Sequence, residues 1–274
     1  MRPAGQSFRV YGSPPYNLVL VHGGPGAAGY LAPVAEKLSR STGIIEAFQT
    51  GYQLDALVRE LQTLVSQNGN PPVILLGHSW GAWLSLMLAA RHPVIVGKLI
   101  LVASAPLEEK YVPRITEIRM SRLGPGEKAR LSELAASLET TDGEERNLIF
   151  GEISRRLSRA DSYEALESYD PGVCPDYDQY RSLWNETENL RRRGELLRIA
   201  ERIRCPVLVI HGTYDPHPSD GIRLPLEKSI GDFRFILLEN CGHEPWTEKH
   251  AASRFFEILE REIMNFNLRD GPSQ

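Results

Sequence analysis

Short runs of apolar residues alternate along the chain with segments whose apolar positions recur every three or four residues. The short runs are mostly continuous rather than alternating, as expected for strands that are buried on both faces of a sheet. They occupy residues 7–11, 17–21, 43–48, 72–76, 98–102, 206–210 and 233–238. The helical patterns occupy residues 30–39, 54–65, 82–91 and 248–266. Strands that alternate with helices predict an α/β fold, with a mostly parallel sheet flanked by helices.

One long segment interrupts this alternation. Residues 107–204 contain no strand pattern but several amphipathic helical stretches. About a hundred residues of helix between two core strands is too long for an ordinary crossover. We therefore expect residues 1–106 and 205–268 to form the core and residues 107–204 to form an inserted helical cap. The polar tail, residues 269–274, is expected to be flexible.

Charge and cysteine content narrow the classes of partner. The formal net charge is −4, with 31 basic and 35 acidic residues distributed along the chain, which gives no support to nucleic acid or an anionic membrane as a partner. The N-terminus lacks the apolar core of a signal peptide. Cys174, Cys205 and Cys241 lack CxxC spacing and fit free thiols in a reducing compartment. We expect a cytoplasmic protein that acts on a small molecule or a short peptide and leave its oligomeric state open.

The segment ILLGHSWGAW, residues 74–83, places one serine between two glycines where an apolar run meets a helical pattern. Gly77-His78-Ser79-Trp80-Gly81 has GxSxG spacing, and a strand before it with a helix after it is the context that this motif requires. A serine on such a tight turn projects its hydroxyl, and the flanking positions need glycine because neighbouring backbone comes close. The motif predicts that Ser79 is a nucleophile; the alternative is a tight turn with an idle serine.

A second glycine-rich segment, HGGPG at residues 22–26, follows the second apolar run directly. Such a loop places a backbone N–H beside the serine, and an acyl-transfer intermediate needs two donors on its oxyanion. We expect the N–H groups of Gly24 and Trp80 to be these two donors, with Gly23 as the alternative to Gly24. The loop lacks the Lys-Ser/Thr pair of a nucleotide-binding loop.

A serine needs a general base, and His243 is the strongest candidate among the seven histidines. It follows the last apolar run in a short loop, and ligand sites form at the carboxyl ends of parallel strands. Asp215 follows the preceding run and is expected to accept the other ring N–H of His243. Considered without Ser79 and His243, Asp215 is better interpreted as a turn-forming aspartate before Pro216. The histidines and cysteines are scattered along the sequence and form no ligand cluster, so no metal or cofactor is expected.

The order Ser79, Asp215, His243, together with HGGPG and GHSWG, resembles the α/β-hydrolase superfamily, and within it the prolyl iminopeptidase-like (proline iminopeptidase) serine hydrolases. The resemblance covers nearly the whole chain. It implies an α/β-hydrolase fold with a helical cap, triad roles for these three residues and oxyanion roles for Gly24 and Trp80. The segment IIEAFQTGYQL, residues 44–54, lacks the DQRGxGxS-like pattern of that group, so the resemblance leaves the substrate open.

The resemblance also implies that carboxylates, largely from the cap, hold the charged amino group of the substrate. Trp184 with Glu186 or Glu188 offers an aromatic wall beside an anion, which suits a small apolar side chain carrying an ammonium. The alternative interpretation is an amphipathic helix with exposed glutamates. We expect Glu186 to be the amine anchor, with Trp184 beside it.

Three functions therefore remain. The first is an aminopeptidase that releases a small N-terminal residue through an acyl-enzyme. The second is a carboxylesterase or lactonase that uses the same triad on a small ester. The third is a non-catalytic ligand-binding protein built on a hydrolase fold. The fold by itself does not choose among them, because it supports many chemistries.

Overall fold

Seven strands form one sheet in the part of the chain that the structure describes. The structure is a computed structural model and describes residues 6–166 and 175–269. The strands are β1 (Phe8–Tyr11), β2 (Tyr16–Val21), β3 (Gly43–Ala47), β4 (Val73–His78), β5 (Val96–Val102), β6 (Val207–Gly212) and β7 (Phe233–Leu238). Their order in the sheet is β1-β3-β2-β4-β5-β6-β7, with β1 antiparallel to β3 and every other neighbouring pair parallel. The predicted α/β fold with a mostly parallel sheet is confirmed.

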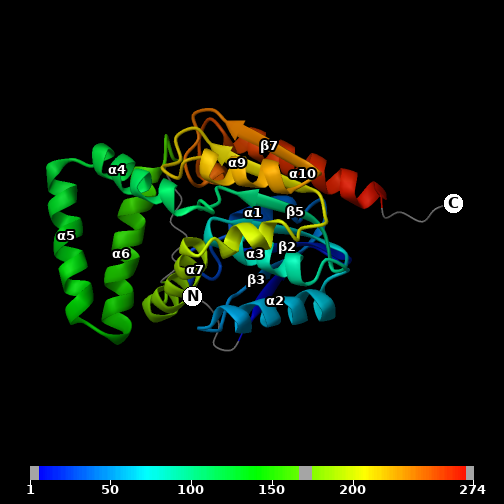
Figure 1. Cartoon of the computed structure of the whole chain (residues 1–274), viewed down its shortest axis with the longest axis horizontal. Coiled ribbons are helices and arrows are strands. Elements are labelled where there is room, and N and C mark those ends of the chain that lie inside the picture. The colour runs from blue at the N-terminus through cyan, green and yellow to red at the C-terminus, as the bar shows by residue number, and fades with distance from the viewer. Residues whose placement is uncertain (1–5, 167–174, 270–274) are drawn as a thin grey trace.

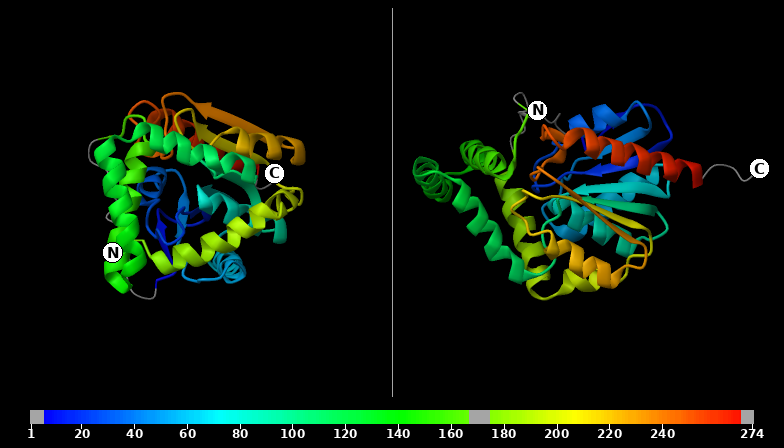
Figure 2. Two further views of the ribbon diagram at one scale, coloured as in Figure 1. Left: turned by 60° about the vertical axis from the view of Figure 1, so that its left-hand side comes forward. Right: turned by 90° about the horizontal axis from the view of Figure 1, so that it is seen from above.

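Helices pack on both faces of this sheet (Figure 1). One face buries α1 (Ala32–Leu38) and α10 (Ala252–Arg269). The other face buries α2 (Leu54–Asn68), α3 (Trp80–Arg91), α8 (Glu195–Ala200) and α9 (Asp220–Ser229). Figure 2 shows α10 and α9 on opposite sides of the strands. Successive residues of a strand therefore enter opposite cores, which explains the continuous apolar runs in the sequence.

The segment between β5 and β6 forms helices joined by loops, and none of its described residues belongs to a strand of the sheet. It contains α4 (Val112–Arg122), α5 (Pro125–Thr140), α6 (Gly143–Asp161), α7 (Tyr177–Arg192) and α8. α5 and α6 form an antiparallel pair that stands away from the sheet, at the end toward which β7 and its parallel neighbours point (Figure 1). Of these helices, α4, α5 and α6 therefore lie beyond the edge of the sheet where parallel strands present their carboxyl ends, whereas α8 packs on a face of the sheet.

Two sequence-based helix assignments needed correction. Helix α9 was not predicted, because it contains Pro225 and its apolar stripe is short. The last helix begins at Ala252 rather than at residue 248, because Pro245–Thr247 forms a separate 3₁₀ turn. Within the described ranges, no helix combines the length and the apolar character needed to cross a bilayer. Cys174 and most of the tail, residues 270–274, lie outside the described residues.

Candidate active site

Ser79 lies on a sharp turn between β4 and α3. Its φ of 53° and ψ of −120° fall in a region that residues with a side chain rarely adopt, and such strain is concentrated at functional sites. Ser79 is only partly buried, whereas the helix that follows is buried on all sides. The turn therefore presents one accessible hydroxyl at the end of an otherwise enclosed strand and helix.

The two glycines of this turn are required by close packing. A Cβ at Gly77 would lie 2.5 Å from both the carbonyl oxygen of Gly81 and Oγ of Ser85. A Cβ at Gly81 would lie 2.4 Å from the carbonyl oxygens of Val21 and His22, at the end of β2. The sequence-based interpretation of GxSxG, that neighbouring backbone leaves no room for side chains, therefore describes the contacts in the structure.

We predict that Gly81→Ala destabilises the fold by at least about 3 kcal/mol, because the added methyl meets backbone oxygens that have no free rotation. Chemical denaturation gives the free energy of unfolding that tests this value. The matched control is Gly126→Ala on α5, where an added Cβ would meet no atom within 4 Å and alanine favours the helix. Equal stability of the Gly81→Ala variant and the parent protein would contradict the prediction.

Asp215, His243 and Ser79 form a line of hydrogen bonds. Nδ1 of His243 lies 2.8 Å from Oδ2 of Asp215, and Nε2 of His243 lies 3.0 Å from Oγ of Ser79. Asp215 follows β6 and its side chain is fully buried, whereas His243 follows β7 and is 12% exposed. Parallel strands bring these loops to one edge of the sheet, although the residues lie far apart in the sequence. The geometry is that of a nucleophile, a general base and a carboxylate that orients the base.

Burial and charge act in opposite directions on this pair. Burial alone would lower the pKa of His243, but the Asp215 carboxylate more than offsets it, and the pKa of His243 is raised. Burial alone would raise the pKa of Asp215, but three histidines, His243, His217 and His211, hold the pKa of Asp215 well below its usual value. Asp215 is therefore ionised at neutral pH and stabilises an imidazolium at His243.

The HGGPG loop packs directly against the nucleophile. A Cβ at Gly23 would lie 2.9 Å from Cβ of Ser79, and Gly24 has a φ of +109° that favours glycine. His22 supports this loop through Gln49, whose side-chain amide donates to the carbonyl oxygen of His22 at 2.9 Å. Trp80 is the first residue of α3, so its N–H has no acceptor within the helix. Trp80 directly follows Ser79, and the HGGPG loop meets Ser79 at Gly23, whereas the atoms nearest a Cβ at Gly24 belong to Ala27 and Gly26.

The loop that carries His243 is held by residues that sequence reasoning missed. The N–H of His243 donates to the carbonyl oxygen of Asp161 at the end of α6, at 3.1 Å. The buried carboxylate of Glu248 accepts from the N–H of Gly242 at 2.9 Å, and also from Ser162 Oγ and from the N–H groups of Tyr163 and Glu164. These hydrogen bonds therefore join the segment after α6 to the loop that carries His243. The only sign of these contacts in the sequence is a glutamate, Glu248, just before the last helix.

Glu244, the neighbour of His243, was also missed. Its Oε1 accepts hydrogen bonds from Tyr30 Oη and from Ser158 Oγ, the latter at 2.6 Å. Burial raises the pKa of Glu244, and these two hydroxyls only partly offset the rise. Among the described residues, no lysine or arginine forms an ion pair with Glu244. Tyr30 stacks near His78, which precedes Ser79, with ring centroids 6.3 Å apart, so this carboxylate borders the site.

The residues expected to hold the substrate amine are engaged elsewhere. Oε2 of Glu186 accepts from the N–H of Leu54 at 2.9 Å, which satisfies the N-terminus of α2. Glu188 pairs with Arg191 and Arg192. Trp184 stacks on Tyr180, with ring centroids 5.6 Å apart, and packs near Trp83. The structure therefore joins Trp184 and Glu186 to neighbouring helices and does not bring Glu186 into hydrogen-bond contact with the triad candidates.

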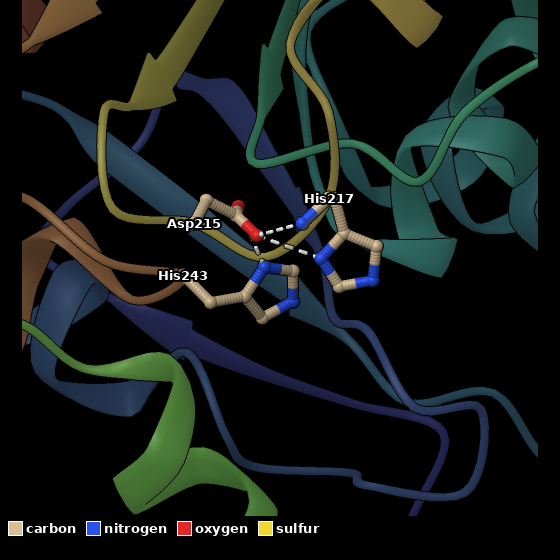
Figure 3. Close-up of side chains that lie close together, drawn as sticks. All are labelled: Asp215, His217 and His243. Atoms are coloured by element: carbon tan, nitrogen blue, oxygen red, sulfur yellow. Dashed lines mark hydrogen bonds and ion pairs between the residues drawn. The ribbon is translucent and has the colours of Figure 1, made fainter. Parts of the chain in front are cut away.

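The expectation that the histidines are scattered was wrong. Asp215, His217 and His243 each offer a ligand atom, and these atoms lie within 4.8 Å of one another (Figure 3). One carboxylate and two imidazoles form a donor set that zinc accepts. The contacts are direct N–H···O hydrogen bonds of 2.7 and 2.8 Å, so protons occupy the positions through which a metal would bind. A metal at this site would have to replace the hydrogen bonds that orient His243.

Residues 16–249 match the family described as alpha/beta hydrolase fold, and the chain belongs to that family. It is a hydrolase. The chain is similar to a proline iminopeptidase of Lactobacillus crispatus, with 25% identity over 271 residues that cover 89% of this chain and 88% of the relative. Among solved structures it resembles VinJ, with a TM-score of 0.68, 22% identity and coverage of 96% and 97%. It also resembles a proline iminopeptidase of Mycobacterium smegmatis, with a TM-score of 0.64, 19% identity and coverage of 97% and 98%.

Proposed function

We propose that this hydrolase cleaves through an acyl-enzyme on Ser79 and releases a small N-terminal residue from a peptide or amide. The observation that carries the proposal is the unbroken line of hydrogen bonds from Asp215 through His243 to Ser79 Oγ. Similarity over nearly nine-tenths of the chain to a proline iminopeptidase favours an aminoacyl substrate over a simple ester.

The reaction follows from these contacts. Ser79 Oγ attacks the carbonyl carbon of the substrate while its proton passes to Nε2 of His243. Asp215 stabilises the imidazolium, and the N–H groups of Gly24 and Trp80 donate to the oxyanion. His243 then gives the proton to the departing amine nitrogen. A water molecule, deprotonated by His243, releases the acyl group and restores the Ser79 hydroxyl.

A substrate with a free amino group also needs a partner for its ammonium. Glu244 meets this need better than Glu186, because Glu244 lies beside His243 and its hydrogen-bond partners are neutral hydroxyls. The Glu186 carboxylate, by contrast, already accepts from Leu54. Among the described residues no lysine or arginine pairs with Glu244, so its carboxylate is open to a charged amine. Glu244 is therefore the anchor that we propose for the substrate ammonium.

Hydrolysis of a set of chromogenic substrates tests the reaction class. The set contains prolyl and alanyl anilides, the same anilides with an acetylated amino group, and short p-nitrophenyl esters. Serine-dependent turnover of the free-amine anilides, far above their acetylated forms, is the expected result. Turnover of esters alone would move the function to an esterase that uses the same residues. Failure of a fluorophosphonate to label the folded protein would favour the non-catalytic alternative.

We predict that Glu244→Gln raises the KM for prolyl anilide about tenfold or more, because the variant loses a charged hydrogen-bond acceptor. The KM for an ester that carries no amino group is expected to stay the same, since the ester makes no such contact. Glu186→Gln is the matched comparison and is expected to leave both constants within about twofold, since its carboxylate faces α2. If Glu186→Gln raised the KM for prolyl anilide and Glu244→Gln did not, the amine anchor would be Glu186 on α7, and the proposal for Glu244 would be wrong.

A further inference from the structure

Two imidazoles lie within hydrogen-bond distance of the Asp215 carboxylate, and a third, that of His211, lies 3.5 Å from Oδ2. Nδ1 of His243 lies 2.8 Å from Oδ2, and Nδ1 of His217 lies 2.7 Å from Oδ1. The backbone N–H of His217 also donates to Oδ1, at 2.9 Å. Figure 3 shows both rings beside the carboxylate of Asp215, with His217 on the same loop as Asp215 and His243 on a separate loop. The hydrolytic reaction proposed above assigns a role to His243 but none to His217.

The contacts define the protonation of His217. An ionised carboxylate only accepts hydrogen bonds, so Nδ1 of His217 carries the proton that it donates to Asp215. Burial lowers the pKa of His217 to about 4, against the attraction of Asp215. At neutral pH His217 is therefore an uncharged ring that donates from Nδ1.

His217 is itself fixed in place. Its carbonyl oxygen lies 2.8 Å from Nε2 of the buried His211 on β6, and prolines precede and follow it in the chain. Its ring stacks on His243, with centroids 4.5 Å apart and an interplanar angle of 29°. His217 is thus a rigid donor: the edge of its ring contacts the Asp215 carboxylate, and one face of its ring contacts His243.

We propose that His217 is a positioning residue of the triad. It holds Oδ1 of Asp215 so that Oδ2 points at His243, and it draws negative charge away from the oxygen that His243 uses. The inference rests on the proposed function, because it treats His243 as the general base.

Charge sharing on Asp215 has a measurable consequence. When His217 no longer donates, more negative charge remains on Oδ2, and the pKa of His243 rises further above its ordinary value. The base must be neutral to accept the serine proton, so labelling or turnover is lost as the pH falls through that pKa. The other titratable or charged groups that face the pair are His211, His78, Asp161, Arg119 and Glu244, and the variants below leave all of them unchanged.

Two variants separate the hydrogen bond from ring packing. His217→Phe keeps a ring against His243 but removes the donor. His217→Asn keeps a donor, because the asparagine amide nitrogen is as many bonds from the backbone as Nδ1 of histidine. The readouts are the rate of Ser79 labelling by a fluorophosphonate as a function of pH, and the titration of the His243 ring followed by NMR.

For His217→Phe we expect labelling at neutral pH to slow about tenfold and the acidic limb to move to higher pH by about half a unit. His217→Asn is expected to stay within about threefold of the parent protein, with an unshifted limb. An unshifted limb in the phenylalanine variant, or equal impairment of both variants, would overturn the proposal. If the parent protein is not labelled at all, the proposed function fails. The NMR titration then decides separately whether His217 sets the pKa of His243.

Discussion

Ser79→Ala is expected to lower kcat/KM for every substrate that the protein turns over, on the order of 10⁶-fold. The Ser79 hydroxyl is the group within 3.0 Å of the His243 base on the side away from Asp215, and alanine offers no atom to attack the carbonyl. Hydrolysis of the chromogenic set gives the rates, and the same variant should resist a fluorophosphonate. The residual rate reflects binding and the oxyanion donors, which the substitution leaves in place.

Ser85→Ala provides the matched control for this loss. Ser85 lies in α3, six residues after Ser79, is fully buried, and donates to the carbonyl oxygen of Gly81 at 2.8 Å. Its removal should affect stability slightly and leave kcat within a few-fold of the parent value. Turnover that survives in the Ser79→Ala variant would show that another group is the nucleophile, and the proposed acyl-enzyme would be wrong.

Asp215→Asn is expected to lower kcat about 10⁴-fold, with little change in KM. The expected loss depends on how the new amide group is oriented, and His217 sets that orientation. Its ring Nδ1–H and its backbone N–H both donate to Oδ1, so an asparagine would place its carbonyl oxygen there. The amide nitrogen would then face His243 and donate to Nδ1. That contact moves the imidazole proton to Nε2, where it blocks acceptance of the Ser79 proton.

The comparison variant for this prediction is Asp220→Asn. Asp220 lies at the start of α9, is exposed, and pairs with Arg223 at 3.2 Å, so its loss should leave kcat nearly unchanged. The pH dependence of Asp215→Asn adds a second test. The carboxylate raises the pKa of His243 in the parent protein, so residual activity in the variant should persist to lower pH. A fall of only a few-fold in kcat would show that Asp215 stabilises the turn before Pro216 and does not orient His243.

The sequence predicted features whose causes lie within a few residues of one another. The seven strands were recognised because a strand buried on both faces must be apolar at nearly every position. The turn at Ser79 was recognised because Gly77 and Gly81 have no room for a side chain. Helix α9 was missed for an equally local reason, since Pro225 argues against a helix although it lies within one.

The sequence was less informative where a side chain had a choice of partners. Glu186 reads as a free carboxylate beside an aromatic residue, yet it accepts from Leu54, 132 residues earlier in the chain. Glu248 stands at the start of the last helical pattern in the sequence, yet it is buried and bonds to the segment after α6, from 84 to 86 residues earlier. Long polar side chains have similar intrinsic preferences everywhere, so the packing of distant elements decides what they contact.

By itself the sequence determined the class of the fold, the strained serine turn and the order of Ser79, Asp215 and His243 along the chain. These features depend on local backbone sterics and on the rule that parallel strands present their carboxyl ends at one edge. Only the tertiary structure decided which groups surround that line of residues. It placed His217 on the carboxylate of Asp215 and Glu244 next to the base, and it turned Glu186 toward α2. The physical reason is that hydrogen-bond partners are set by distances between loops, and those distances exist only once the sheet and its overlying helices have packed.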